Sequence, residues 1–195
     1  MRALAIETFT GSVAYILAFT LVVLLIGPMQ SALITIPGTP NAPDPSLLFL
    51  PHGVRILAAW LFKWRAVVIL LPGAAIMHFA FLGSAGFSGY ALMPLFVGVF
   101  VAPFTFELFK RLGWNLYAGT GAPRWRGVML VGFCASILNS LLTNYAYAAS
   151  PSSYFGYLIG DFFGLFFAFL ILLAVFRAYE RRTNVDPTGG APKEQ

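Results

Sequence analysis

Apolar residues gather into six long runs along this chain, separated by short polar or proline-rich segments. A helix that crosses a bilayer needs about 20 mostly apolar residues, and the runs have about this length. The pattern therefore predicts transmembrane helices. The predicted spans cover, in chain order, residues 11–27, 46–62, 66–84, 89–109, 127–148 and 154–179. We expect residues 1–179 to form one all-α domain, a polytopic bundle of six transmembrane helices.

The segments outside these spans are polar or rich in proline. Residues 28–45 hold five prolines. Because proline removes a backbone donor and clashes with the preceding helical turn, this stretch is expected to be an external loop. Pro51 and Gly53 interrupt the second span near its start, and that span is also short. Residues 180–195 are polar and contain proline and glycine, which predicts a disordered cytoplasmic tail.

The composition excludes a water-soluble fold. Charged residues make up 10% of the chain and apolar residues 59%, with a mean hydropathy of +0.81. So few polar groups could not cover the apolar surface in water, whereas lipid can solvate it. The net charge of +5 does not indicate a nucleic-acid partner, because the basic residues form short clusters beside apolar runs.

The basic residues also predict the topology. Cytoplasmic loops carry an excess of Lys and Arg, and a six-span chain returns its C-terminus to the side of its N-terminus. Eleven of the twelve basic residues then fall on one side: Arg2, Lys63, Arg65, Lys110, Arg111, Arg124, Arg126, Arg177, Arg181, Arg182 and Lys193. Only Arg55 does not. We expect a multi-pass protein of the bacterial inner membrane with both termini in the cytoplasm.

Several polar residues interrupt the apolar spans. Ionisable groups within a bilayer are costly and usually face the interior of the bundle. The candidate ligand-binding residues are His52, Arg55, His78, Asn139, Asn144 and Asp161. The helical rise per residue places all six in the outer half of the membrane. This predicts a polar pocket that opens outward, with Arg55 and Asp161 as a charge pair at its base. The alternative is a purely structural pair, with the histidines near the lipid headgroups.

The sequence gives weaker support to a haem site, to proton transfer and to catalysis. His52 and His78 at matching depth are an alternative pair of axial ligands for haem b, and Asp161 with His78 is an alternative proton shuttle. Otherwise no cofactor is expected. The sequence shows no Ser/His/Asp set at one depth and no His-x-x-Glu-His motif, so we expect no enzymatic activity. Cys134 is the single cysteine, which excludes an internal disulfide.

Residues 46–178 resemble the MASE1 family of integral membrane sensor domains. The likeness lies in the run Leu50-Pro51-His52-Gly53-Val54, the turn at Trp64-Arg65, Pro72-Gly73 in the next span, and Gly160-Asp161-Phe162-Phe163-Gly164. The last of these is similar to that family's Gly-Asp-x-x-Gly signature. The resemblance implies a sensory role, with Arg55 and Asp161 in the sensory pocket. Because no soluble output module follows the last span, we expect the signal to pass through a separate partner.

Two other functions stay open. As a predicted compact protein of six helices, the chain also resembles the S components of energy-coupling factor transporters. This resemblance implies a subunit for the uptake of a small solute. The third possibility is an accessory subunit of a larger membrane complex. In each case the expected partners are the lipid bilayer and another membrane or cytoplasmic protein.

Overall fold

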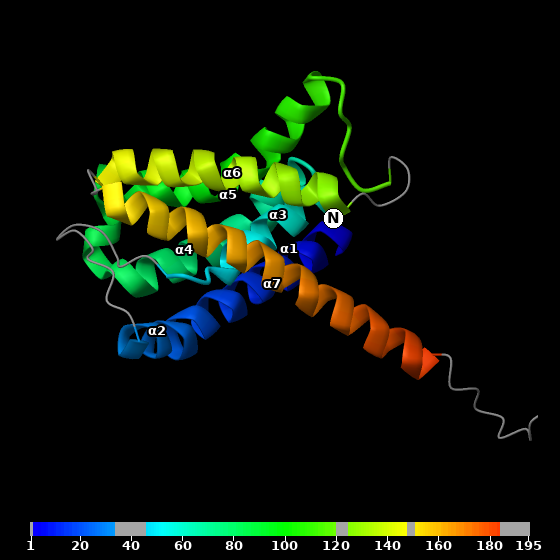
Figure 1. Cartoon of the computed structure of the whole chain (residues 1–195), viewed down its shortest axis with the longest axis horizontal. Helices are drawn as coiled ribbons and strands as arrows, with labels where there is room; N and C mark the ends of the chain where they lie inside the picture. The colour runs from blue at the N-terminus through cyan, green and yellow to red at the C-terminus, as the bar shows by residue number, and fades with distance from the viewer. Residues whose placement is uncertain (1, 34–45, 120–124, 148–150, 184–195) are drawn as a thin grey trace, which may run out of the picture.

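The computed structural model describes residues 2–33, 46–119, 125–147 and 151–183, and within these ranges every regular element is a helix. Figure 1 shows their arrangement. The elements are α1 (Arg2–Leu21), the π-helical turn η1 (Val22–Ile26), α2 (Gly27–Leu33), α3 (Leu50–Phe62), α4 (Arg65–Leu82), the 3₁₀ turn η2 (Gly83–Phe87), α5 (Gly89–Arg111), α6 (Trp125–Tyr147) and α7 (Pro151–Thr183).

Among the described residues, five helices are long and apolar enough to cross a membrane. They cover Arg2–Ala32, Arg65–Phe87, Gly89–Arg111, Trp125–Ala146 and Tyr154–Ala178. The chain is therefore all-helical, with the character of a multi-pass membrane protein. The predicted second span differs from the others, because its helix α3 has only 13 residues and is about 20 Å long.

The helices end at slightly different residues from those the sequence pattern predicts. α7 continues to Thr183, into the segment predicted as a disordered tail, and residues 184–195 lie outside the described part of the chain. The helix formed by α1, η1 and α2 likewise extends into the predicted loop 28–45 as far as Leu33, and residues 34–45 of that loop are outside the described residues.

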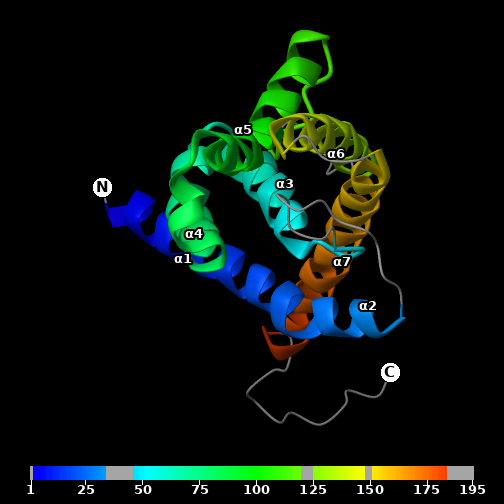
Figure 2. The same ribbon diagram turned by 90° about the vertical axis from the view of Figure 1, so that its left-hand side faces the viewer.

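The short helix α3 lies in the middle of the bundle. It contacts α1, α4, α5, α6 and α7, and Figure 2 shows the five helices arranged around it. Along this ring α1 packs against α4, α4 against α5, α5 against α6, and α6 against α7. Polar residues carried by α3 are thereby placed at the centre of the bundle.

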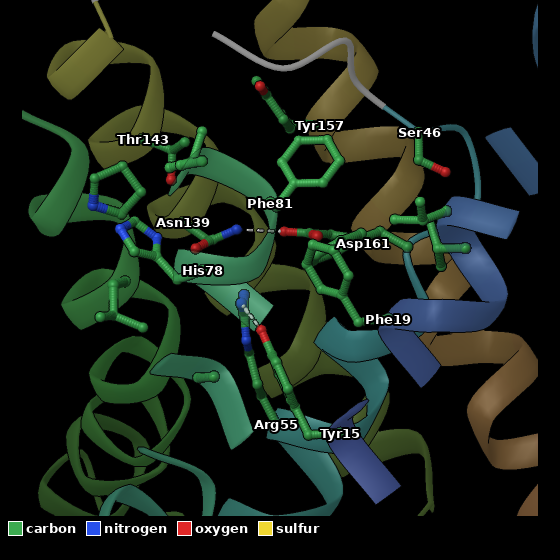
Figure 3. A pocket seen from close by; sticks show the side chains of 17 residues that line it. Tyr15, Phe19, Ser46, Arg55, His78, Phe81, Asn139, Thr143, Tyr157 and Asp161 are labelled. Atoms are coloured by element: carbon green, nitrogen blue, oxygen red, sulfur yellow. Dashed lines mark hydrogen bonds between the residues drawn. The ribbon is translucent and has the colours of Figure 1, made fainter. Parts of the chain in front are cut away.

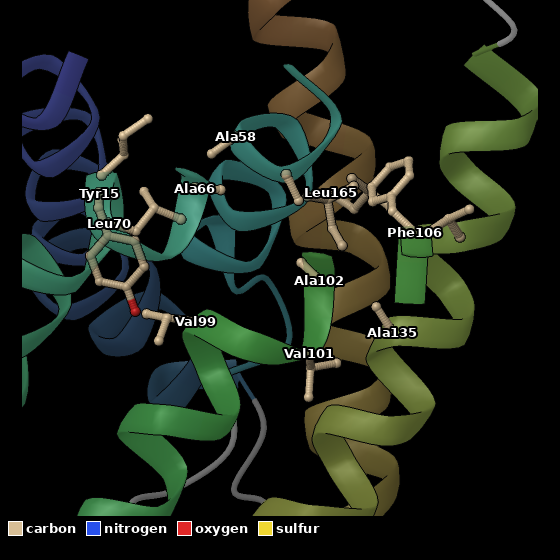
Figure 4. Close-up of a cluster of buried hydrophobic side chains, with 14 of the residues drawn as sticks. Tyr15, Ala58, Ala66, Leu70, Val99, Val101, Ala102, Phe106, Ala135 and Leu165 are labelled. Carbon is tan, nitrogen blue, oxygen red and sulfur yellow. The ribbon is translucent and has the colours of Figure 1, made fainter. Parts of the chain in front are cut away.

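The bundle is apolar outside and partly polar inside, as expected for a protein solvated by lipid. Phe96, Phe100 and Phe104 form an exposed stripe at helical spacing on α5. The interior contains an apolar cluster that includes Phe106 and Leu165, shown in Figure 4. It also contains the buried polar residues Ser12, His52, Arg55, Thr105, Ser136, Asn139, Ser140, Thr143 and Asp161.

Helix α4 contains Pro72. Next to this proline, the side chain of Ser12 of α1 forms hydrogen bonds with two backbone groups of α4. The Ser12 hydroxyl donates to the carbonyl of Ile69 at 3.0 Å and accepts from the N–H of Gly73 at 3.2 Å. These two backbone groups would bond to each other in a regular helix. The hydroxyl is inserted between them, and it links α1 to α4 inside the apolar core.

The α3–α4 turn and the segment 112–119 lie at one end of the bundle. The ring of Tyr117 stacks on Phe106 with centroids 5.3 Å apart, and Nζ of Lys63 lies 5.6 Å from its centroid. Ala118 N–H donates to the carbonyl of Trp60 at 3.1 Å. Burial and the neighbouring carboxylate of Glu107 raise the pKa of Tyr117 to about 12. The same end carries an ion pair between Arg65 and Glu7.

Candidate functional site

The start of α3 is held against α7 by a close approach of two backbones. Phe49 N–H donates to the carbonyl of Gly160 at 2.8 Å. A Cβ on Gly160 would collide with the carbonyl of Ser46, and one on Gly164 would collide with that of Phe49. The two glycines of the Gly-Asp-x-x-Gly motif therefore allow the non-helical segment 46–49 to lie directly on α7, next to Asp161.

The backbone of segment 46–49 has polar partners although it is not helical. Leu47 N–H donates to the Gln30 side chain at 2.6 Å, and Leu48 N–H lies 3.3 Å from Oγ of Ser46. Non-helical backbone at membrane depth is tolerated only where protein or a polar cavity satisfies it. α3 is therefore a short helix that follows the non-helical segment 46–49 and whose first turn begins inside the bundle.

Asp161 is the centre of a buried polar network. Its Oδ2 accepts from Nδ2 of Asn139 at 2.7 Å and lies 3.3 Å from Nδ1 of His52. On the other side of the imidazole, Nε2 of His52 lies 3.1 Å from Oγ of Ser136. Ser136 in turn donates to the carbonyl of Gly132 at 2.9 Å. The network joins α3, α6 and α7, and its side chains are almost completely shielded from solvent.

Arg55, one helical turn after His52, has different partners. Its Nη2 donates to the hydroxyl of Tyr15, and its Cζ lies 5.3 Å from the ring centroid of Tyr15 and 5.5 Å from that of Phe49. Gly98 of α5 makes room for the guanidinium, because a Cβ there would lie 2.8 Å from Cζ of Arg55. Nε of Arg55 is buried and has no hydrogen-bond partner in the part of the chain that the structure describes. The cation is thus contacted by a neutral hydroxyl and two aromatic faces.

Between Arg55 and Asp161 lies a cavity of about 200 Å³. Figure 3 shows the guanidinium pointing up toward the Asn139–Asp161 pair from below, with Phe19 and Phe81 on the opposite side of the space from His78. The lining residues are Tyr15, Phe19, Val22, Val23, Ser46, Phe49, Arg55, Ala74, His78, Phe81, Leu82, Pro94, Leu95, Asn139, Thr143, Tyr157 and Asp161. The space therefore combines a few polar groups with a mostly apolar wall, as ligand pockets do.

Aromatic rings and an irregular helix form one wall of the cavity. Phe19 packs edge-on against Phe49 and Phe81, with centroids 5.8 and 6.1 Å apart. The wall continues through Val22 and Val23, which belong to the π-helical turn η1. Single π-helical turns inside α-helices are frequent at functional sites.

Comparison with known proteins gives no match. No family model matches the chain, and no curated protein or solved structure is similar to it. The function has to be argued from the cavity itself.

Four of the six residues predicted for the site line this cavity: Arg55, His78, Asn139 and Asp161. His52 lies behind Asp161 and contacts it directly. Asn144 is not among the lining residues, and its Nδ2 donates to the carbonyl of Ser140 in its own helix at 2.7 Å.

The expected direct pairing of Arg55 with Asp161 needs correction. Asp161 contacts His52, and Arg55 donates to Tyr15; among the described residues no ion pair joins Arg55 to Asp161. Both side chains nevertheless face the same cavity. The two charges share a space without touching.

The histidines do not fit the alternative of axial haem ligands. Nδ1 of His52 contacts Asp161 and its Nε2 contacts Ser136, so both ring nitrogens are engaged within the protein. Nε2 of His78 lies 3.0 Å from the carbonyl of Gly86. Among the described residues, no group of three or more His, Cys, Asp or Glu side chains could hold a metal ion.

The sequence reasoning missed Tyr15, Ser136 and Thr143. Ser136 and Thr143 lie three residues before and four residues after Asn139, the spacing that places side chains on one face of a helix. This polar face of α6 could have been found from the sequence. Tyr15 could not, since a single tyrosine in an apolar span gives no sign of the arginine it meets.

Proposed function

We propose that the protein is an integral membrane ligand-recognition protein, sensory in role and MASE1-like, that acts through a separate partner. The observation that carries this proposal is the cavity of about 200 Å³ lined by Arg55, Asn139 and Asp161. Charged groups within a membrane protein commonly mark ligand or ion sites because their burial is costly. A purely structural role would be served by a direct ion pair, whereas here the two side chains do not touch each other and both line the cavity.

We further propose six crossings with both termini in the cytoplasm of a bacterium. The non-helical segment 46–49 continues α3 toward the other face, so that the short helix and this segment together complete a crossing. The bundle end that carries Lys63 and Arg65 is then the cytoplasmic end. The cavity, near η1 and Ser46, lies toward the opposite end and opens to the outside.

The second candidate function is an uptake subunit for a small solute, and the non-helical segment 46–49 ahead of α3 favours it. Transporters commonly place their substrate next to discontinuous helices near the middle of the membrane. Reconstituted vesicles separate the two functions. A sensor binds its ligand without accumulating it, whereas an uptake subunit accumulates the ligand when its energising partner is present.

Native mass spectrometry of the protein, gently extracted from its own membrane, tests the proposal. We expect a small molecule to be released from the wild type and from Asn144→Ala, a polar change outside the cavity, but not from Asp161→Ala. Thr143→Met, which extends an apolar side chain into the cavity and leaves the Asp161 network in place, should also lose the molecule. A wild-type chain that carries only lipid would contradict the proposed function.

A further inference from the structure

The two charged groups that line the cavity are satisfied to very different degrees. Asp161 accepts a hydrogen bond from Asn139, contacts the His52 ring, and lies beside the first turn of α3. The N-terminal end of a helix favours negative charge, so these three surroundings offset part of the cost of burying a carboxylate. Among the described residues, the polar and aromatic partners of Arg55 are the Tyr15 hydroxyl and the rings of Tyr15 and Phe49, and its Nε has no hydrogen-bond partner.

This difference indicates that the cavity lacks an anionic partner for Arg55. A guanidinium has five N–H donors in a fixed fork that matches the two oxygens of a carboxylate. Arg55 is 9% exposed, and taking such a cation out of water is costly unless an anion accompanies it. Since the described residues provide no anion in direct contact with Arg55, a ligand that brings one carboxylate would complete the site.

The size and the wall of the cavity limit the rest of the ligand. Its volume of about 200 Å³ is somewhat larger than an engineered apolar cavity of about 150 Å³ that accepts benzene. The rings of Phe19, Phe49 and Phe81 line the cavity. A single ring or a short alkyl chain would therefore fit, whereas a nucleotide or a lipid would not.

We propose that the cavity binds a small monocarboxylic acid with a compact apolar body. Its carboxylate contacts the guanidinium of Arg55, and its body lies among Phe19, Phe49 and Phe81. This inference rests on the proposed function and specifies its ligand class. A phosphate ester fits less well, because its second negative charge would meet no second cation among the lining residues. An amine fits less well, because its positive charge would add to that of Arg55 in the same cavity, where Oδ2 of Asp161 already has two partners.

Isothermal titration of the full chain in lipid nanodiscs tests the inference with three probes of similar shape: benzoate, benzyl alcohol and benzylamine. Hexanoate serves as the alkyl counterpart of benzoate. We expect benzoate or hexanoate to bind at least about tenfold more tightly than the alcohol, because a charge-assisted pair replaces a neutral hydrogen bond. This comparison uses the wild type, so it does not depend on whether a variant folds.

Variants of Arg55 then locate the contact. Arg55→Gln should abolish the preference for benzoate over benzyl alcohol, and Arg55→Lys, which keeps the charge but loses the fork, should retain part of it. Arg65→Gln, at the exposed end of α4, is the matched control and should bind like the wild type.

Two results would overturn the inference. Benzylamine or benzyl alcohol binding as tightly as benzoate would exclude a carboxylate ligand, while a small molecule released in native mass spectrometry would leave the proposed function standing. If no probe binds and the molecule released in native mass spectrometry lacks a carboxylate, a carboxylate ligand is likewise excluded and the proposed function stands. If the extracted chain carries only lipid, the proposed function itself fails.

Discussion

The Asp161 carboxylate lies 3.3 Å from Nδ1 of His52, and this contact joins the first turn of α3 to α7. Asn139 of α6 donates to the same carboxylate oxygen at 2.7 Å. Three helices that are distant in sequence therefore meet at one buried carboxylate. Arg55, one turn further along α3, faces the same cavity from below (Figure 3).

The contact predicts strong coupling between His52 and Asp161. A double-mutant cycle with His52→Leu and Asp161→Leu should give a coupling energy of about 1–3 kcal/mol, since each single change leaves a polar partner buried. Unfolding in mixed micelles measures it. The matched cycle of Arg55→Leu with Asp161→Leu should give a smaller value, because these side chains do not touch. A larger coupling for Arg55 would show that the charges pair directly.

The glycines of α7 are predicted to be intolerant of a methyl group. Gly160→Ala should destabilise the protein by about 1–3 kcal/mol, because the added Cβ meets the backbone of segment 46–49 and not a flexible side chain. The control is Gly89→Ala at the start of α5, where a Cβ would meet nothing within 4 Å. Thermal unfolding compares the two variants. Equal melting temperatures would contradict the close packing of α3 on α7.

Ser12 is predicted to stabilise the bundle more than an ordinary serine does. Ser12→Ala leaves the Ile69 carbonyl and the Gly73 N–H without the bridging hydroxyl, which should cost about 1–2 kcal/mol of unfolding free energy. Ser31→Ala removes a single exposed hydroxyl bond and should change the stability little. If both variants unfold alike, the hydroxyl does not bridge the break at Pro72.

The raised pKa of Tyr117 predicts that the protein becomes less stable at high pH. Its pKa is raised from 10.0 to about 12 in the folded protein, so the folded state binds the proton more tightly than the unfolded state does. Stability should therefore fall as the pH rises from about 10 to about 12. Ultraviolet titration of tyrosinate measures the ionisation. Tyr117→Phe should remove the component of this titration that appears near pH 12. If Tyr117→Phe instead removes a component near pH 10, the raised pKa of this hydroxyl is contradicted.

Much of the helical layout could be predicted from the sequence, because length and apolar content decide which segments suit a bilayer. α3 differs for a physical reason. Segment 46–49 is not helical where it lies against Gly160 and Gly164, and this tertiary contact gives no local signal. The helical pattern did contain the information that Asn144 lies apart from the site: five residues after Asn139, it falls on another face of α6.

The members of the site were easier to predict than their contacts. Costly polar residues at similar depth indicated that Arg55, Asn139 and Asp161 share one region. The sequence could not tell which neighbour of Asp161 would reach it, since His52 and Arg55 lie three residues apart on one face of α3. The choice depends on Tyr15 and on the space beside Gly98, which come from α1 and α5.

The claim of a polar cavity that opens outward is tested most directly by thiol labelling in sealed membranes. In a Cys134→Ser background, Thr143→Cys places a thiol in the cavity wall, and Thr105→Cys places one in the buried part of α5 outside it. We predict that a small membrane-impermeant reagent added from outside labels Thr143→Cys and not Thr105→Cys, and that Thr143→Met no longer releases the bound molecule. Labelling of Thr143→Cys only from the cytoplasmic side, or from neither side, would contradict the account.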